Sequence, residues 1–399
     1  MPSQKVSFTG AQGDRLDARL DRPAGPVRAY ALFAHCFSCS KDIHAAARIA
    51  KGLAERGIAV LRFDFTGLGS SEGDFANTNF SSNVEDLIAA ANFLRDEYDA
   101  PQILIGHSLG GAAVIMAAQH LPQVKAVVTL GAPADADHVT HQFKAQIDEI
   151  KDKGSAEVSL EGRRFTIKKQ FLEDVSGHNI EAALHELKAA VLIAHAPRDE
   201  IVGIENATRL FVAARHPKSF LSLDDGDHLL SRVEDSQHAA SVISAWAERY
   251  GASNLMDHAP QASRANVGLV AETGQGGYHS FAIVGAHKGF MDEPLSHGGL
   301  DGGPNPYDML KLALAGCTTM TLRMYAERKG WDVGLIRTEV SHEKIEIEGH
   351  EGRRDVFTRK ISVTQPIEAA IRTKLLEIAD KCPVHKTLER GSDVKTGFS

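Results

Sequence analysis

A serine between two glycines is the first feature of the sequence that could do chemistry. Ser108 lies in Gly106-His107-Ser108-Leu109-Gly110, which has the pattern G-x-S-x-G. An apolar, strand-like run precedes this segment and an apolar, helix-like run follows it, as a sharp strand-to-helix turn requires. Side chains in place of the glycines would clash with the neighbouring strand and helix. The segment therefore predicts a nucleophilic serine on such a turn.

A serine hydroxyl is a weak nucleophile at neutral pH and needs a base. Two candidate partners follow two predicted strands: Asp199 comes after residues 191–194, and His228 comes after residues 220–223. The carboxyl ends of parallel strands meet at the edge of a sheet where ligands bind. We therefore expect both side chains to lie near Ser108.

The order serine, acid, histidine is the one that accompanies G-x-S-x-G in this setting. It predicts Ser108 as nucleophile, His228 as general base and acid, and Asp199 as the group that orients the imidazole. Asp225 and Asp227 are weaker alternatives to Asp199, because they lie beside the histidine rather than after a separate strand.

The developing oxyanion needs backbone N–H donors. One should be the amide of Leu109, directly after the nucleophile, and the other should come from the loop AHCFSCSKD that follows the predicted strand at 29–34. Phe37 is the expected second donor, and Cys36 is the alternative.

The same loop contains a C-x-x-C pair, Cys36 and Cys39. Two cysteines supply only half of a structural zinc site, and the sequence has neither a second C-x-x-C nor an H-E-x-x-H. We expect the pair to pack beside the site, with a redox or metal role as the alternative. No G-x-G-x-x-G follows a strand, so neither a metal nor another cofactor is expected.

The elements that must position these residues alternate between short apolar runs and amphipathic helices. The predicted strands are residues 29–34, 59–63, 102–105, 126–130, 191–194 and 220–223. Such alternation predicts a doubly wound, mainly parallel sheet covered on both faces, here with an antiparallel edge at 6–8 and 16–21. One insertion interrupts it, at about 134–184, with a charged helix (142–153) and a hairpin (157–167, turning at 161–162). We expect this insertion to be a lid.

Residues 1–250 resemble an α/β-hydrolase of the serine esterase type. The resemblance rests on the G-x-S-x-G turn, its two partners and FDFTGLGSSEG at 63–73, which is similar to the D-x-x-G-x-G-x-S segment of these enzymes. It implies hydrolysis of an ester, thioester or amide through an acyl-serine intermediate.

The second half has a different pattern. After a polar linker at 251–263, a hairpin is expected from 267–272 and 280–284, and a long apolar helix from 307 to 329. Paired strands at 336–347 and 356–364 follow, and Pro366 should open a helix that runs through 379. Strands and helices in separate runs predict an α+β domain at 264–399.

Two cysteines stand out in this domain. Cys317 lies inside the apolar helix, whereas Cys382 precedes Pro383, which can begin a helix at its first position. A helix amino terminus and the neighbouring Lys381 and His385 would lower the pKa of the Cys382 thiol.

Residues 264–399 resemble the OsmC and organic hydroperoxide resistance family, on GPNPYDMLKLALAGC before Cys317 and the Cys-Pro at Cys382. The resemblance implies an intertwined homodimer and thiol peroxidase chemistry, in which Cys317 attacks a hydroperoxide and Cys382 resolves it as a disulfide. The sequence has Tyr307 where the hydroperoxide reductases carry glutamate, and its hairpin has no arginine. Buried cysteines with little peroxidase activity are the alternative.

Composition limits the partners. The 399 residues are 43% hydrophobic and 24% charged, with 44 basic and 52 acidic residues and a net charge of −8. This balance and the absence of a basic run give no reason to expect nucleic acid or membrane binding. Neither an apolar span nor a secretory signal is recognisable, so we expect a cytoplasmic protein whose thiols are reduced unless they act in redox chemistry.

The sequence thus predicts an esterase that cleaves carboxylic esters and is joined to an OsmC-like domain that forms a homodimer. In one alternative the protein is a thiol-dependent organic hydroperoxide reductase that uses Cys317 and Cys382, and the hydrolase half handles an oxidised ester. In another the second domain only holds two hydrolases together.

Overall fold

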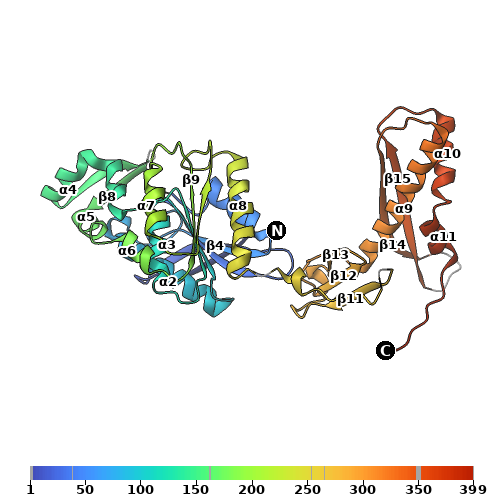
Figure 1. Cartoon of the computed structure of the whole chain (residues 1–399), viewed down its shortest axis with the longest axis horizontal. Helices are drawn as coiled ribbons and strands as arrows, with labels where there is room; N and C mark the ends of the chain where they lie inside the picture. The colour runs from blue at the N-terminus through green and yellow to red at the C-terminus, as the bar shows by residue number, and fades with distance from the viewer. Residues whose placement is uncertain are drawn as a thin grey trace. The chain divides into compact units, whose positions relative to one another are not determined.

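The computed structural model describes residues 3–37, 39–160, 163–252, 254–264, 266–346 and 352–398. The chain divides into two compact units, Met1–Pro260 and Gln261–Ser399. Figure 1 shows the elements of both units.

An eight-stranded sheet forms the centre of the first unit, in the order β1-β2-β4-β3-β5-β6-β9-β10. The strands are β1 (Ser3–Thr9), β2 (Arg15–Asp21), β3 (Ala29–Ala34), β4 (Ile58–Phe63), β5 (Ile103–His107), β6 (Ala126–Leu130), β9 (Ala190–His195) and β10 (Lys218–Ser222). The first two are antiparallel to their neighbours, and the remaining pairings are parallel. The predicted mainly parallel sheet with an antiparallel edge is confirmed.

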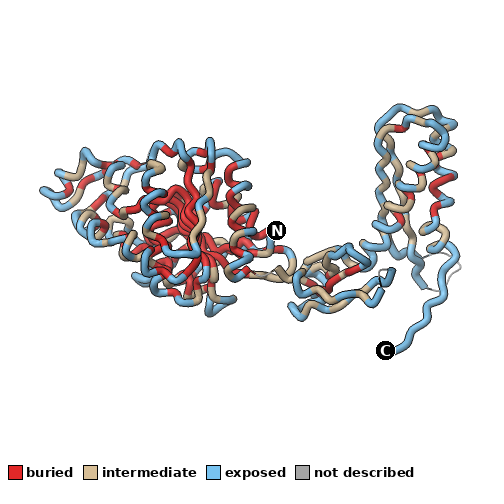
Figure 2. Tube along the Cα trace, viewed as in Figure 1, coloured by how far each residue is buried: buried red, intermediate tan, exposed pale blue. Residues whose placement is uncertain are grey.

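Alternation along each buried strand divides the core into two layers. In β3 all six side chains are buried, and Leu32 joins one hydrophobic cluster while Ala31 and Phe33 join the other. Helices α2 (Phe80–Glu97), α3 (Leu109–Ala118), α6 (Ile180–Glu186) and α7 (Glu205–Ala213) contribute to the first cluster. Helices α1 (His44–Ala54) and α8 (Val233–Ala247) contribute to the second. Figure 2 shows the buried strands at the centre of this unit.

The insertion between β6 and β9 has its own small structure. It consists of a 3-10 segment (Ala136–Gln146), α4 (Ile147–Lys153), the strands β7 (Ser155–Leu160) and β8 (Arg163–Lys168), α5 (Lys169–Val175) and α6. The hairpin is present, although its predicted turn at 161–162 lies outside the described residues. The charged helix predicted at 142–153 is confirmed only from Ile147 to Lys153, because Phe143 has a non-helical conformation and breaks the first part.

The described residues of the second unit form two small sheets, three α-helices and one short 3-10 helix, Leu295–His297. Strands β11 (Gly268–Glu272), β12 (Ser280–Val284) and β13 (His287–Met291) form one sheet, and β14 (Ile336–Glu346) and β15 (Arg353–Val363) form the other. The helices are α9 (Pro306–Lys329), α10 (Ala369–Ala379) and α11 (Pro383–Arg390). The third strand of the first sheet was not predicted, and the helix expected from Pro366 begins at Ala369.

Helix α9 begins where its sequence dictates. The Asn305 side chain accepts from the Asp308 amide, and the Asp308 carboxylate accepts from the Asn305 amide. Pro306 occupies the first helical position, where its missing N–H costs nothing. This capping box positions the helix that carries Cys317.

Candidate active site

Ser108 lies on a strained turn between β5 and α3. Its φ of 55° and ψ of −127° are unusual for a residue with a side chain. The turn is possible only with small neighbours: a Cβ on Gly106 would lie 2.2 Å from the carbonyl oxygen of Gly110, and a Cβ on Gly110 would lie 2.5 Å from that of His35. Because it directly follows β5, the serine on this turn lies at the carboxyl edge of the sheet.

Asp199 and His228 are joined by a hydrogen bond. The Asp199 Oδ2 lies 2.7 Å from the His228 Nδ1. The other carboxylate oxygen accepts from the amides of Ile201 and Val202, both at 2.9 Å. Burial would raise the pKa of Asp199, but these hydrogen bonds and the imidazole outweigh it and lower the pKa below its ordinary value. The carboxylate therefore stays ionised and holds the imidazole in one orientation.

The two alternative acids have other partners. Asp225 forms an exposed ion pair with Arg198 at 3.1 Å, and Asp227 accepts from the amide of Ser231 at 2.8 Å. Neither carboxylate is hydrogen-bonded to the His228 ring, so among the described residues Asp199 is the acid that the structure joins to it.

Ser108 and His228 line one pocket of about 370 Å³. Its other lining residues are Cys36, Phe37, Gln142, Ser159, Leu160, Ile201 and Leu229. The serine hydroxyl and the imidazole are not hydrogen-bonded to each other in this structure, and such contacts often tighten only when substrate binds. The walls are mainly apolar, and several of their residues come from the insertion.

The expected oxyanion donors lie next to this pocket. Leu109 is the first residue of α3, so its amide has no acceptor within the helix. Phe37 lines the pocket from the loop after β3. Beyond Phe37 this loop is fixed by Asp64, which accepts from the Lys41 amide at 2.6 Å and from the Lys41 Nζ at 2.7 Å.

Cys36 and Cys39 form a disulfide in the same loop. The general expectation of reduced thiols does not hold for this pair, for which the sequence left a redox role open. Their Cα atoms lie 5.3 Å apart, because the Cys39 amide donates to the Cys36 carbonyl at 3.2 Å and closes a tight turn. That separation is within the ordinary range for a disulfide.

Two buried histidines support the site and were missed from the sequence. The His107 Nε2 lies 2.6 Å from the carbonyl oxygen of His228, and the His195 Nε2 lies 2.7 Å from that of Val202. Burial lowers the pKa of both rings, that of His107 to about 3. Each therefore acts as a neutral hydrogen-bond donor to a loop that carries the acid or the base. The only sign of these roles in the sequence was position: His107 directly precedes Ser108, and His195 is the last residue of β9.

The two cysteines of the second unit lie together. Cys382 is the N-cap of α11, and its Sγ accepts from the His385 amide at 3.4 Å and from the Thr318 hydroxyl at 3.8 Å. Burial would raise the pKa of Cys382, but these donors and the Cys317 thiol outweigh it and lower that pKa. For Cys317, burial and the neighbouring Cys382 raise the pKa. The structure thus favours the thiolate at Cys382, and the peroxidatic role of Cys317 stays a prediction.

Arg359 completes this cluster and was not predicted. Its guanidinium donates to the Thr318 hydroxyl at 3.0 Å, to the Ala379 carbonyl at 2.8 Å and to Asp380 at 2.7 Å. It comes from β15, so a search of the first hairpin for an arginine could not find it.

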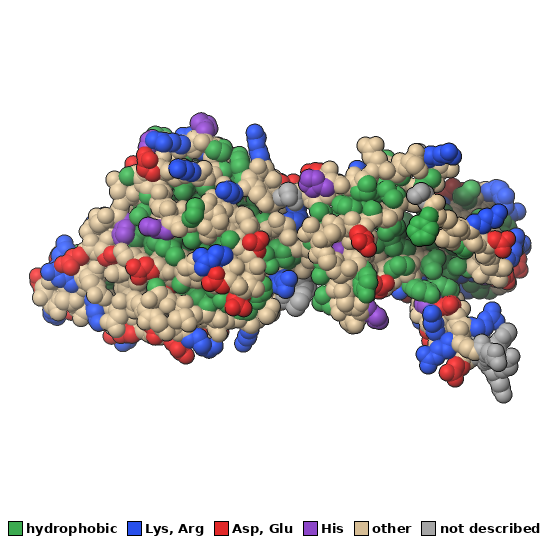
Figure 3. All heavy atoms as spheres, turned by 90° about the horizontal axis from the view of Figure 1, so that it is seen from below, with side chains coloured by type: hydrophobic (Ala, Val, Ile, Leu, Met, Phe, Trp, Pro, Cys, Tyr) green, Lys and Arg blue, Asp and Glu red, His purple; other side chains and the backbone are tan. Residues whose placement is uncertain are grey.

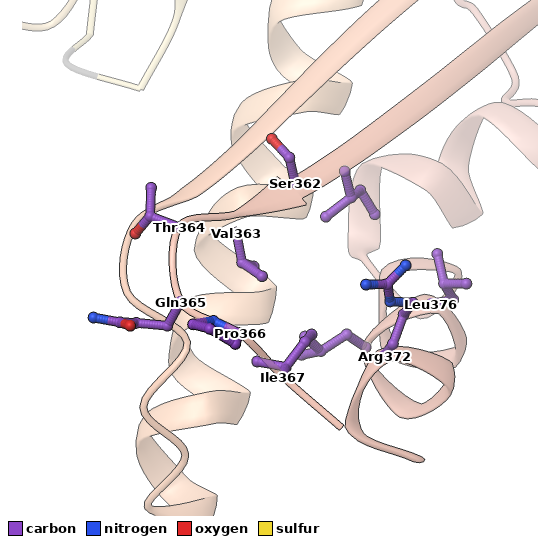
Figure 4. A pocket seen from close by; sticks show the side chains of 10 residues that line it. Ser362, Val363, Thr364, Gln365, Pro366, Ile367, Arg372 and Leu376 are labelled. Carbon is purple, nitrogen blue, oxygen red and sulfur yellow. The ribbon is translucent and has the colours of Figure 1, made fainter. Parts of the chain in front are cut away.

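A larger cavity, about 550 Å³, lies between the end of β15 and α10 (Figure 4). Its lining residues are Ile361, Ser362, Val363, Thr364, Gln365, Pro366, Ile367, Arg372, Leu375 and Leu376. None of them is a cysteine or histidine, so this cavity is separate from the thiol cluster and holds no nucleophile of that kind.

Within the described ranges, no group of three or more histidine, cysteine or acidic side chains is arranged to hold a metal ion. In the same part of the chain no helix is both long and apolar enough to span a membrane.

Comparisons with known proteins match the two units separately. The family model described as serine aminopeptidase, S33, matches residues 26–164, and the model described as OsmC-like protein matches residues 298–397. Palmitoyl-protein thioesterase ABHD10 from mouse is 29% identical over 188 residues, which are 45% of this chain and 62% of the relative. The rat protein of that name is 30% identical over 37% of this chain and 50% of its own length. The chain thus spans about half to three fifths of these relatives.

Solved structures give the fold of the first unit. The esterase domain of a Rhodothermus marinus protein is 50% identical, with a TM-score of 0.53, and the match covers 63% of this chain and 99% of that one. The mouse alpha/beta hydrolase domain-containing protein 10 has a TM-score of 0.53 at 22% identity, covering 62% of this chain and 99% of that one. The chain is therefore a member of the α/β-hydrolases that carries a C-terminal OsmC-like domain.

Proposed function

We propose that the first unit hydrolyses carboxylic esters through an acyl-serine intermediate. The observation that carries this proposal is the Asp199–His228 pair at 2.7 Å, whose imidazole opens on the same pocket as the strained Ser108. A serine on this turn, beside a histidine held by a buried carboxylate, is the arrangement that acyl transfer requires.

Each group has a defined role in the proposed reaction. The Ser108 oxygen attacks the ester carbonyl while His228 accepts its proton, and the negative charge that develops is bound by the amides of Leu109 and Phe37. His228 then gives the proton to the departing alcohol, which leaves an acyl-serine. A water molecule, deprotonated by His228, releases the carboxylic acid and restores the serine.

The pocket supports an apolar acyl group as substrate. Phe37, Leu160, Ile201 and Leu229 line it, and among the described residues its polar lining consists of Gln142 and Ser159 besides Ser108 and His228. The relatives named as an esterase and as palmitoyl-protein thioesterases agree with an acyl substrate. We propose the oxygen ester as the substrate, and a thioester with the same acyl group is the direct comparison.

The test is steady-state hydrolysis of p-nitrophenyl esters from acetate upward, with acyl-coenzyme A thioesters of matched length alongside. Turnover should be lost in Ser108→Ala and should fall by about 10⁴-fold in kcat in Asp199→Asn. Asp225→Asn, an exposed carboxylate in an ion pair, is the matched control and should keep wild-type kinetics. Equal turnover in Ser108→Ala and wild type would contradict the proposal.

We further propose that the second unit forms a homodimer. Helix α9 exposes Leu312, Met320 and Met324 at 60%, 69% and 71%. With Gly316, around whose Cβ position nothing lies within 4 Å, they form a stripe with a four-residue spacing. Figure 3 shows hydrophobic side chains over much of the visible surface of this unit. Such a stripe is typical of a helix that packs against another.

A cytoplasmic location stays a prediction.

A further inference from the structure

We propose that Cys36 and Cys39 are a reversible redox modification site that controls the hydrolase. In this proposal, which rests on the proposed ester hydrolysis, the disulfide holds the loop that carries the Phe37 amide in its active position. Reduction to two thiols releases that loop and slows turnover.

The disulfide lies in the wall of the active-site pocket. Cys36 lines the pocket together with Ser108 and His228, and Phe37, inside the four-residue turn that the disulfide closes, lines it as well. A change in the covalent state of this turn therefore acts directly on the site where the oxyanion develops.

The loop is anchored outside the turn, so the effect of reduction should be local. At the first residue of the turn, the His35 Nδ1 lies 2.7 Å from the Cys36 carbonyl oxygen, and that ring is buried. After it, the buried Lys41 bonds Asp64 through both its amide and its Nζ. Within the turn, the backbone bond from Cys39 to Cys36, at 3.2 Å, is the one link besides the disulfide that the described residues show.

The Phe37 ring connects this turn to the insertion. Its centroid lies 5.0 Å from that of Phe171 in α5 and 5.3 Å from that of Phe75. A shift of the turn would therefore disturb the aromatic contacts that hold the insertion over the pocket. This gives the disulfide a second route to the rate of hydrolysis, through the shape of the acyl pocket.

The pair can be reached by small reagents through the pocket. Cys36 and Cys39 are only 5% and 2% exposed, so bulk solvent scarcely touches them. Cys36 nevertheless contributes to the open pocket, through which a small dithiol can approach. A reductant of this class attacks one sulfur as a thiolate, forms a mixed disulfide and then closes its own ring. Two electrons and two protons pass to the protein, which gains two thiols, and the reagent becomes a cyclic disulfide.

The expected effect is on kcat more than on KM. Oxyanion donors act on charge that develops in the transition state, and removing one donor costs about 10²–10³ in kcat. Here the Phe37 amide is loosened rather than removed, so we expect kcat to fall by about tenfold on reduction, with KM changed by less than about threefold.

The experiment uses the full chain in its oxidised and dithiothreitol-reduced forms. Thiols are counted by alkylation and peptide mass spectrometry, and kcat and KM are measured on the best p-nitrophenyl ester. Cys36→Ser/Cys39→Ser should show the low kcat of the reduced protein with or without reductant. Cys317→Ser/Cys382→Ser, which alters only the thiols of the second unit, should keep the full response.

Support requires that the kcat of the wild type falls when Cys36 and Cys39 become alkylatable and recovers on reoxidation. The proposal is overturned if kcat is unchanged while both thiols are alkylated, if dithiothreitol does not reduce the pair in the folded protein, or if the Cys36→Ser/Cys39→Ser variant still responds. Ester turnover that does not change with the redox state of Cys36 and Cys39 would overturn the redox proposal but not the proposed ester hydrolysis. Absence of turnover in both states would reject both.

Discussion

At the scale of the residue, the site depends on buried imidazoles that remain neutral. His107 is 2% exposed and lies against the carbonyl of His228, and burial lowers its pKa from 6.5 to about 3. Protonation would place an unpaired charge next to the proposed general base. Because Nε2 of the neutral ring faces the His228 carbonyl oxygen, which can only accept, the proton lies on Nε2 and is donated to that carbonyl.

This shift predicts how the stability of the first unit depends on pH. The native state leaves His107 unprotonated between about pH 6.5 and 3, whereas the unfolded chain binds a proton there. The free energy of unfolding should therefore fall as the pH drops through this window, by up to about 1.4 kcal/mol per pH unit from this one group, and level off below it.

Thermal unfolding between pH 7.5 and 4 checks this prediction. His107→Gln, which keeps an N–H donor, should lose stability less steeply as the pH falls. His238→Gln, a change on the exposed side of α8, should follow the wild type. If the stability of His107→Gln falls with pH as steeply as that of the wild type, groups other than His107 cause the loss of stability in acid.

Single residues also show what the sequence could predict. Ser108, Asp199 and His228 each follow a strand of the parallel sheet, so their positions in the sequence predicted that they would lie at the same edge of the sheet. His107 and His195 were missed because their role is set by contacts between loops, which no local pattern records.

At the scale of the element, the insertion supplies walls of the pocket that Ser108 lines. Ser159 and Leu160 come from β7, and Leu160 is 3% exposed. The sequence predicted the β7–β8 hairpin, and in the structure the buried residues of β7 alternate, as a strand that covers a core requires. The helix before it was misjudged, because its charged sequence continues across the break at Phe143.

Shortening a wall residue should change the acyl preference. Leu160→Ala removes three carbon atoms from the pocket wall, so the ester with the highest kcat/KM should become longer. The ratio of kcat/KM between long and short esters should rise about tenfold, the scale set by one or two methylenes in an apolar pocket. Glu157→Ala, on an exposed position of the same strand, is the control. An unchanged chain-length profile in Leu160→Ala would exclude the insertion from acyl selection.

At the scale of the whole molecule, the described residues of the first unit form two large hydrophobic clusters, whereas those of the second unit form one small cluster. The core of the second unit is a small cluster around Leu322, Ala326 and Leu375, while much of α9 remains exposed. The sequence predicted the α+β character of this unit, but not β13, whose strand His287–Met291 contains lysine and glycine and lacks a clear alternating pattern.

The exposed stripe on α9 gives a test of assembly. The wild-type chain should sediment as a dimer, and Met320→Lys/Met324→Lys should sediment as a monomer, because two charges would be desolvated in the interface. Val212→Lys, which changes an equally exposed apolar residue of the first unit, should remain dimeric. A monomeric wild type at micromolar concentration would contradict the proposed homodimer.

The central claim is that Ser108 is the nucleophile, and covalent labelling tests it most directly. The full chain is treated with a fluorophosphonate, and the modified residue is located by peptide mass spectrometry. We predict one adduct per chain, on Ser108, with labelling slowed in Asp199→Asn because the imidazole is no longer held for proton transfer. No adduct, or an adduct on another residue in a folded wild-type protein, would contradict the claim.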